Sequence, residues 1–210
     1  MTDTIRERVL IEALFEIPDS GFSDMTLTNA AARAGIGTRE LQDAFPQGPA
    51  SLVEAFSSWA DQRMLEKLAL NEPEKHIRDR IASAVRARIE VLIPYKESAR
   101  RAGTFLAQPQ NAPLGATLLM RSVDAMWRAS GDHSSDFSYY TKRATLAGVY
   151  GATLAYWFSD SSEGNSSTWT FLGRRIEDVM RLERFKGAAK DALAKLPDPF
   201  GILAGLRGGK

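Results

Sequence analysis

Cysteine is absent from this 210-residue sequence, and its absence excludes disulfide bonds and thiolate metal sites. Histidine is nearly absent, since only His76 and His133 occur, and neither forms a helical pair with the spacing of metal ligands. No stretch reaches the roughly 18 uncharged apolar residues that span a bilayer. The formal net charge is only +1, which argues against attachment to nucleic acid mainly through charge. We therefore expect no metal site, no disulfide framework and no membrane-spanning segment.

Sequence patterns that carry catalysis are missing as well. Asp132, His133 and Ser134 are consecutive, and consecutive side chains in a turn diverge instead of forming a catalytic relay. The Gly35–Gly37 turn lacks the preceding strand and the third glycine of a dinucleotide-binding loop. No serine lies in a nucleophile elbow. The sequence therefore predicts a protein that is not an enzyme and has no cofactor.

Helical periodicity is what the sequence does contain, and no long segment alternates with the period of a β-strand. Apolar residues make up 44% of the chain and charged residues 25%, which is typical of a globular protein. A helix is predicted from Thr4 to about Ile17. Two short helices follow, the first capped by Thr26 and the second spanning Thr38–Phe45, with the Gly35–Gly37 turn between them. The sequence predicts an all-α fold that begins with a helix-turn-helix.

A helix-turn-helix suggests DNA binding, with the Thr38–Phe45 helix as the reading helix. That helix has one basic residue, Arg39, while Glu40 and Asp43 would face the polyanion. From residue 26 to residue 50 there are two basic and two acidic side chains, so no positively charged surface is predicted. We therefore interpret the motif as a packing unit and expect no nucleic-acid partner.

The clearest boundary in the chain is the polar segment Asn71-Glu72-Pro73. It divides an N-terminal lobe, residues 1–70, from a larger helical lobe, residues 74–184, and a tail follows at residues 185–210. Pro94 is expected to break a helix inside the larger lobe. Ser166 or Ser167 is expected to cap the last long helix.

The centre of the larger lobe is predicted to be a helix that Asp136 caps and that ends near Phe158. From Ala144 onward it is apolar on nearly every side, which predicts a helix buried all round. Each glycine inside a helix costs about 1 kcal/mol relative to alanine, so its stripe of small residues predicts close approach of another helix or a ligand. This stripe consists of Ala144, Gly148, Gly151, Ala152 and Ala155.

Aromatic residues at helical spacing in this lobe have two interpretations. They either form ordinary core or line a cavity between helices, which is a common place for small-molecule binding. The residues predicted to line a lipid-binding cavity are Phe105, Leu118, Trp127, Gly148, Tyr150, Gly151 and Trp157.

Tyr139 and Tyr140 precede Lys142 and Arg143 near the start of the central helix. Aromatic side chains beside cations at such a position suit an anchor for a partner protein. The alternative is that one of the tyrosines caps the core with its hydroxyl in water. Both interpretations stay open on the residues alone.

The tail is apolar along one stripe and basic beside it. It either packs back on the body as an ordinary helix or lies in a membrane interface. Pro197 and Pro199 forbid one continuous helix through it. The residues predicted to touch a membrane are Phe185, Lys186, Lys190, Leu193, Leu196, Phe200, Ile202, Leu203 and Leu206.

Several ordered motifs are found between about Ile93 and Met180, and a weaker collinear pattern covers the N-terminal lobe. They are Ile93-Pro94-Tyr95, Ser122–Trp127, Gly131-Asp132, Ser135-Asp136-Phe137, Tyr140–Ala144, Asp160–Ser162 and Thr168–Leu172. Together they resemble the lipid-binding accessory proteins of coenzyme Q (ubiquinone) biosynthesis. The resemblance implies a tetracycline-repressor-like helical fold, with a degenerate helix-turn-helix and a larger ligand-binding lobe.

The resemblance also implies a function. Members of that family are non-enzymatic lipid chaperones, which bind isoprenoid quinone intermediates and present them to a di-iron hydroxylase at the membrane. The surface that faces this partner corresponds here to Asp124, Met126, Tyr139, Tyr140 and Arg143, with Tyr139 at a position where the family often has tryptophan. A homodimer is expected.

Eukaryotic members carry an N-terminal targeting extension that is not seen in this sequence. We therefore expect either a bacterial protein or a trimmed form of a longer chain, located in the cytoplasm at the periphery of the inner membrane. The alternative function, from a different class, is a ligand-responsive transcriptional regulator of the tetracycline-repressor type.

Overall fold

The computed structural model describes residues 4–132 and 137–194, and within them every regular element is a helix. The all-α prediction is therefore confirmed for the described residues. In chain order the elements are α1 (Ile5–Ala13), α2 (Ile17–Ser20), α3 (Asp24–Arg33), α4 (Thr38–Ala44), α5 (Pro49–Ala69), α6 (Ile77–Leu92), η1 (Ile93–Tyr95), α7 (Lys96–Leu106), α8 (Ala112–Ala129), α9 (Phe137–Ser159), η2 (Glu163–Asn165) and α10 (Ser166–Ala194).

The chain divides into two compact units, residues 1–172 and 173–210. The second unit contains the remainder of α10, where Arg175 pairs with Asp178 at 2.8 Å and Arg181 lies 3.7 Å from Glu177 on exposed turns. Helix α10 continues through residues 184 and 185 without a break. The lobe boundaries predicted from the sequence at residues 70–74 and 184–185 remain predictions.

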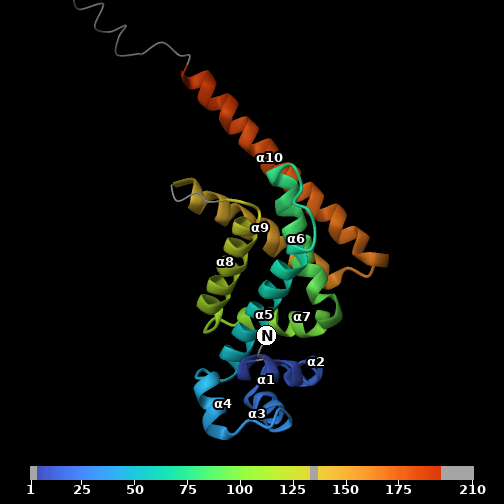
Figure 1. Cartoon of the computed structure of the whole chain (residues 1–210). Helices are drawn as coiled ribbons and strands as arrows, with labels where there is room; N and C mark the ends of the chain where they lie inside the picture. The colour runs from blue at the N-terminus through green and yellow to red at the C-terminus, as the bar shows by residue number, and fades with distance from the viewer. Residues whose placement is uncertain (1–3, 133–136, 195–210) are drawn as a thin grey trace, which may run out of the picture. The chain divides into compact units, whose positions relative to one another are not determined.

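In the first unit, α1 and α3 pack on each other and against α5, α4 packs against α1, and α2 packs against α7 (Figure 1). Their core contains the fully buried Val9, Ala13 and Ala30. The prediction that Thr26 caps the third helix is wrong, because Ser23 is the N-cap and its hydroxyl accepts from the Thr26 amide at 3.1 Å. Thr26 is itself fully buried, and its hydroxyl donates to the carbonyl of Gly21. Thr26 is the third residue inside α3, so its hydroxyl ties the helix to the preceding turn instead of capping it.

The predicted helix-turn-helix is confirmed by α3, α4 and the turn between them. Gly35 has a φ of +68°, a conformation that side chains with a Cβ rarely adopt. The Glu40 carboxylate accepts from the Gly37 amide at 3.1 Å and stabilises the start of α4. Helix α4 itself buries none of its residues fully.

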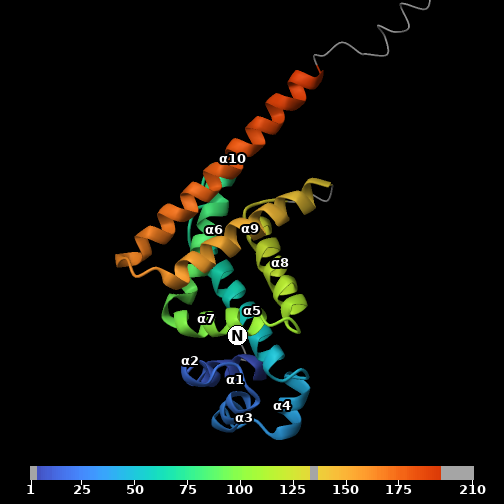
Figure 2. The same cartoon turned by 180° about the vertical axis from the view of Figure 1, so that it is seen from behind.

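The larger bundle is built from α5 to α9 (Figures 1 and 2). Helix α5 packs against α6 and α8, and α8 packs against α9. Pro94 ends α6 as predicted, because it lies in the short η1 turn that separates α6 from α7. The centre of the bundle contains Val85, Ile89, Met126 and Trp157, which have no exposed surface.

Helix α9 differs from its prediction. It is buried on one face only, with Leu146, Val149 and Trp157 on that face. The stripe of small residues is largely exposed, and a Cβ added at Gly148 or Gly151 would meet no atom within 4 Å. The expectation that α9 is buried all round from Ala144 is therefore wrong. Small side chains raise the apolar count of a sequence while burying little area, so apolar composition overstated the burial. The predicted cap, Asp136, lies outside the described residues.

Candidate functional site

A cavity of about 320 Å³ lies among α5, α6, α7, α8 and α9. Its lining is mostly aliphatic, with Phe56 and Tyr150 as its aromatic residues. Three of the residues predicted to bind lipid, Leu118, Tyr150 and Gly151, are part of this lining. The remaining lining residues are Val53, Ser57, Ala60, Arg88, Leu92, Ala99, Ala102, Gly103, Leu106, Ala107, Gly115, Leu119, Ser122 and Leu154.

The other predicted lipid-binding residues lie elsewhere in the first unit. The Phe105 ring is 6.4 Å from the ring of Phe22. Trp127 donates its indole N–H to the carbonyl of Lys142 at 3.2 Å. Trp157 is fully buried and donates to the Asn165 side chain at 3.1 Å. Gly148 is exposed on α9, outside the cavity lining. These four positions contribute to packing or to surface instead of to the cavity wall.

A buried polar cluster interrupts the apolar wall of the cavity. The Arg88 guanidinium, only 5% exposed, donates from Nε to Asp61 Oδ1 at 2.6 Å and from Nη2 to Ser57 Oγ at 3.1 Å. Its Nη1 donates to the Tyr150 hydroxyl. Ser122 donates to the second Asp61 oxygen at 3.0 Å. The Asp61–Arg88 pair therefore has no net charge, and its polar atoms are held by hydrogen bonds.

The tyrosine of this cluster is held in its neutral form. Burial raises the pKa of Tyr150, the nearby Arg88 charge opposes that rise, and the Asp61 charge reinforces it. Since the net shift is upward, Tyr150 keeps its phenolic proton throughout the physiological pH range. The cavity thus contains a neutral hydrogen-bonding group in an otherwise mainly apolar wall.

The sequence patterns do not single out Asp61 and Arg88 as site residues. A signal did exist, because Arg88 lies in helical phase with Ile81, Ala84 and Val85 on the buried face of α6. A charged residue on a buried face needs a partner. The sequence alone does not show which acid supplies it, because Asp61 is on a different helix.

Four of the five residues predicted to bind a partner lie together where α8 and the start of α9 meet. We call Asp124, Tyr139, Tyr140 and Arg143 the tyrosine cluster. Arg143 Nε donates to Asp124 Oδ1 at 2.7 Å, and the Tyr139 hydroxyl donates to the same oxygen at 3.2 Å. The Arg143 guanidinium lies 3.4 Å from the centre of the Tyr139 ring. Arg143 is 2% exposed, so it positions Tyr139 from beneath.

Tyr140 is the exposed member of the tyrosine cluster. Its side chain is 69% exposed, and its ring meets that of Tyr139 edge-on at 5.1 Å. Asp124 also pairs with the exposed Arg128 at 2.8 Å. The fifth predicted residue, Met126, is fully buried, so its side chain is not available on this surface.

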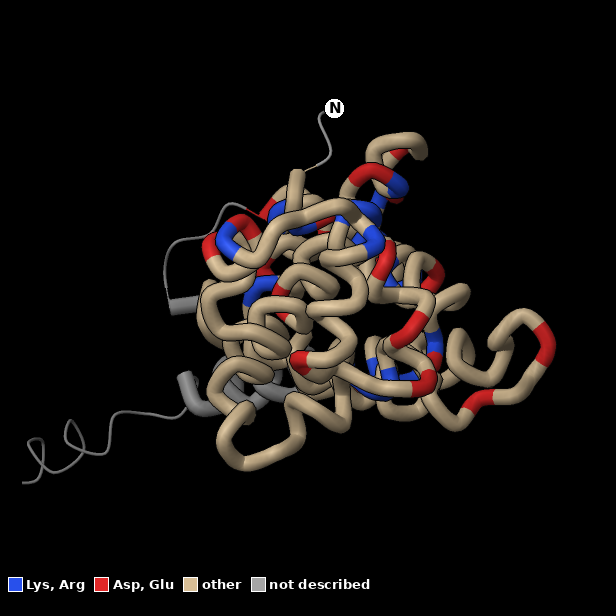
Figure 3. The backbone as a smooth tube through the Cα atoms, turned by 90° about the horizontal axis from the view of Figure 1, so that it is seen from below, with Lys and Arg blue, Asp and Glu red and all other residues tan. Residues whose placement is uncertain are grey.

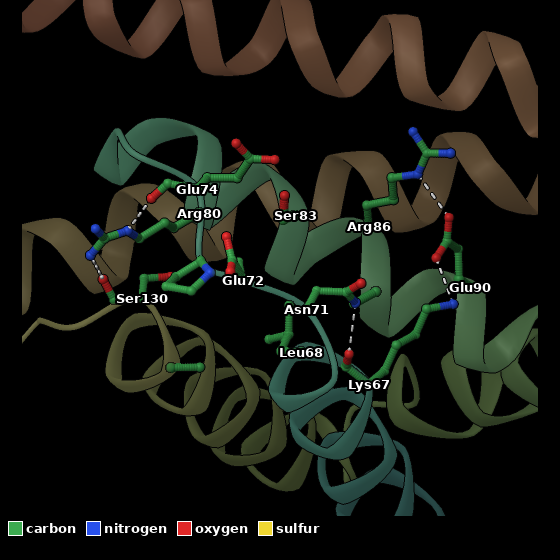
Figure 4. Close-up of a pocket in the computed structure, with 13 residues that line it drawn as sticks. Lys67, Leu68, Asn71, Glu72, Glu74, Arg80, Ser83, Arg86, Glu90 and Ser130 are labelled. Carbon is green, nitrogen blue, oxygen red and sulfur yellow. Dashed lines mark hydrogen bonds and ion pairs between the residues drawn. The ribbon is translucent and has the colours of Figure 1, made fainter.

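A second pocket, of about 420 Å³, lies where the end of α5, the segment after it, α6 and the end of α8 meet (Figure 4). Its walls are charged. Glu90 pairs with Lys67 at 2.7 Å and with Arg86 at 2.8 Å, and Arg80 donates to the Glu74 carbonyl at 2.6 Å. These contacts satisfy the basic groups of the pocket internally. The apolar cavity is therefore the better candidate for a lipid, although it is smaller.

The predicted membrane-touching residues are not placed by the structure. Phe185, Lys186, Lys190 and Leu193 belong to α10, but their side chains lie outside what is described, and Leu196, Phe200, Ile202, Leu203 and Leu206 lie outside the described residues altogether. Among the described residues, no helix is long and apolar enough to cross a membrane. The same residues contain no group of three or more side chains suited to hold a metal ion.

The helix order, the helix-turn-helix and the cavity bundle define the fold of tetracycline-repressor-type proteins. A solved structure, the TetR transcriptional regulator from Nitrosomonas europaea, matches with a TM-score of 0.64 over 82% of this chain and 96% of that chain. The identity is 19%, so this likeness shows the fold alone.

Sequence comparison identifies the family. The COQ9 family pattern matches residues 112–183. The mitochondrial ubiquinone biosynthesis proteins COQ9 of Rattus norvegicus and Homo sapiens are 35% and 32% identical over 188 residues, or 86% of this chain. The protein of that name in Drosophila melanogaster is 33% identical over 187 residues. The chain belongs to the COQ9 family. It spans 60%, 59% and 57% of the length of the rat, human and fly proteins.

Proposed function

We propose that this protein is a non-enzymatic, lipid-binding accessory protein of ubiquinone biosynthesis. It binds an isoprenoid quinone intermediate and presents it to a membrane-associated di-iron hydroxylase. The names of its COQ9 relatives support the pathway. The observation that carries lipid binding is the mainly apolar, partly open cavity among α5 to α9.

The size of the cavity indicates which part of a lipid it suits. About 320 Å³ is at the lower end of ordinary ligand pockets, which run from about 300 to 1,000 Å³. This volume suits a substituted ring with a short stretch of chain and is too small for a long polyisoprenoid. The rest of the tail would then leave through the opening of the cavity.

The tyrosine cluster is the proposed contact surface for the hydroxylase. Tyr140 presents a large, exposed aromatic side chain, and Arg143 and Asp124 hold its neighbour Tyr139 in one orientation. Aromatic side chains held in one orientation often contribute a large share of the binding energy of a protein interface. The tail, residues 185–210, is the proposed membrane-touching segment. Homodimerisation and a cytoplasmic location peripheral to the inner membrane remain predictions.

A pair of glycines on α9 tests whether the cavity holds the lipid. Gly151 lines the cavity and Gly148 does not, yet both have open space where a Cβ would be. Gly151→Leu should place a side chain at the cavity and weaken binding of an isoprenoid benzoquinone at least about tenfold by equilibrium dialysis, because it occupies the volume of the ligand. Gly148→Leu should bind like the unmodified protein.

Leucine has a higher helix propensity than glycine, so neither substitution should unfold α9. Equal affinities for the two variants would place the lipid outside this cavity. Loss of binding in both, with unchanged thermal stability, would move the site to the exposed face of α9.

A further inference from the structure

One member of a buried charge pair lines the cavity, and a purely apolar lipid would not require it. Arg88 is in the cavity lining and is 5% exposed, and Asp61 pairs with it at 2.6 Å from outside the lining. Buried ion pairs contribute little net stability compared with apolar residues of the same shape. Stability alone therefore does not explain why charged groups are buried here, and we consider that they recognise a ligand.

The hydrogen bonds of the cluster leave one donor without an acceptor. Arg88 donates to Asp61, to Ser57 and to the hydroxyl oxygen of Tyr150. That oxygen therefore acts as an acceptor, and across the described part of the chain the Tyr150 hydroxyl donates in no hydrogen bond. Tyr150 is 2% exposed and lines the cavity. Buried hydroxyl protons nearly always have a hydrogen-bond acceptor. The Tyr150 hydroxyl proton has none among the described residues, and an oxygen of a bound ligand would supply one.

The charges around the Tyr150 hydroxyl determine which kind of oxygen it can receive. Arg88 polarises the phenol by donating to its oxygen, which strengthens the remaining O–H as a donor. Asp61 neutralises the Arg88 charge, so the cluster offers no net positive charge to an anion. Bringing a carboxylate or phosphate into this wall would bury a charge without compensation, and that is costly. A neutral oxygen has no such cost.

We infer that the cavity receives the oxygen-bearing ring of the lipid, with the Tyr150 hydroxyl donating to a neutral carbonyl or ether oxygen of that ring. This inference rests on the proposed lipid-binding function. It adds the orientation of the bound lipid and the selectivity for its head group. The ring enters first, and the hydrocarbon tail lies toward the opening. Lipids whose heads are anionic, such as fatty acids and phospholipids, are disfavoured at this site.

The test compares two ligands on two tyrosine variants. The ligands are a benzoquinone with a short alkyl tail and the alkylbenzene with the same tail, which lacks oxygen. Tyr150→Phe should weaken binding of the quinone about tenfold, the value of one buried hydrogen bond, and leave the alkylbenzene unchanged. Tyr156→Phe is the matched control, because Tyr156 is on the same helix outside the cavity lining and should alter neither affinity.

Infrared spectroscopy gives a readout that packing alone would not change. The carbonyl stretch of the quinone should move to lower frequency on binding to the unmodified protein and should not do so on Tyr150→Phe. Equal affinity of the unmodified protein for both ligands, or equal weakening of both by Tyr150→Phe, would overturn the inference while leaving lipid binding intact. Absence of binding for both ligands to the unmodified protein would overturn the proposed function itself. Tighter binding of the matching alkyl carboxylate than of the quinone would contradict the selectivity.

Discussion

At the scale of single residues, Asp160 connects a sequence motif to a structural cause. Its carboxylate accepts from the Ser162 hydroxyl at 2.6 Å and amide at 2.8 Å, and from the Thr168 amide at 2.9 Å and hydroxyl at 2.5 Å. Ser162 Oγ accepts from the Ser167 amide at 3.0 Å. The expectation that Ser166 or Ser167 caps the last helix is therefore wrong, because Asp160 and Ser162 satisfy its first amides from the preceding loop. The motifs at residues 160–162 and 168–172 thus fit together as one cap.

Asp160→Ala should lower stability in a pH-dependent way. Hydrogen bonds from the Ser162 side chain, then from Thr168, hold the pKa of Asp160 well below its usual range. Because the folded-state pKa is depressed, the stabilisation is fully present above the ordinary aspartate pKa of about 4 and is lost as the pH falls below it. At neutral pH we expect a loss of about 1 kcal/mol, typical of a helix cap.

Thermal unfolding of both proteins between neutral pH and about pH 3 measures this effect. The difference between them should shrink as the pH falls. Glu163→Ala removes an exposed carboxylate from the same loop and is the control. A difference that stays constant with pH would show that Asp160 acts through packing and not through its charge.

Single residues also show which parts of the cavity the sequence predicts and which parts it does not. The sequence predicts Leu118, Tyr150 and Gly151 in the cavity wall, and all three lie there. Asp61 and Arg88 were missed as site residues, because pairing between α5 and α6 is decided by tertiary packing and not by spacing along the chain. Aromatic character favours Trp127 and Trp157 as lining residues, but each donates its indole N–H to a local acceptor and packs outside the cavity lining.

At the scale of elements, α9 carries two different surfaces. Tyr150 on its buried face and the half-buried Gly151 line the cavity, and its first turns supply Tyr139, Tyr140 and Arg143 of the tyrosine cluster. Periodicity predicted the helix itself, because apolar residues recur at helical spacing. It could not predict the exposed stripe, because alanine and glycine are compatible with either environment. One helix would therefore place the ligand and the partner surface on a single rigid body.

Tyr140→Ala should weaken binding to the hydroxylase by about 2 kcal/mol or more, which is roughly 30-fold in Kd. The side chain is 69% exposed, so the variant should keep its thermal stability. Tyr156→Ala removes another partly exposed tyrosine of α9, at 39% exposure, and should leave the affinity unchanged. Surface-plasmon or calorimetric titration with the hydroxylase measures the effect. If Tyr140→Ala lost stability and affinity together, the tyrosine would be a cap on the core instead of an interface anchor.

At the scale of the whole molecule, the sequence predicts the helices better than it predicts the residues of the cavity. Long amphipathic segments and the glycine turn predicted the helices, and Pro94 ended α6 as expected. The predicted family and fold are confirmed by the relatives and by the solved regulator structure. Which helices enclose a cavity depends on the packing of five helices at once, so no local pattern could reveal it.

The fold is shared with a transcriptional regulator, but the charges of this chain predict no specific binding to duplex DNA. On α4, Glu40 and Asp43 are exposed beside Arg39. Basic and acidic residues are interspersed along the chain in the view of Figure 3. A gel-shift titration against the region upstream of its own gene should show no complex that survives physiological salt, because counterion release needs a cluster of cations. A nanomolar, salt-resistant complex would restore the regulator interpretation.

We propose above all that the α5–α9 bundle carries an isoprenoid quinone intermediate. Mass spectrometry of lipids extracted from the purified 210-residue protein tests it most directly. We predict that an isoprenoid quinone or its phenolic precursor co-purifies with the unmodified protein and with Gly148→Leu, and that it is depleted from Gly151→Leu. An extract without any isoprenoid ring lipid, or one with the same lipids in Gly151→Leu as in the unmodified protein, would contradict the claim.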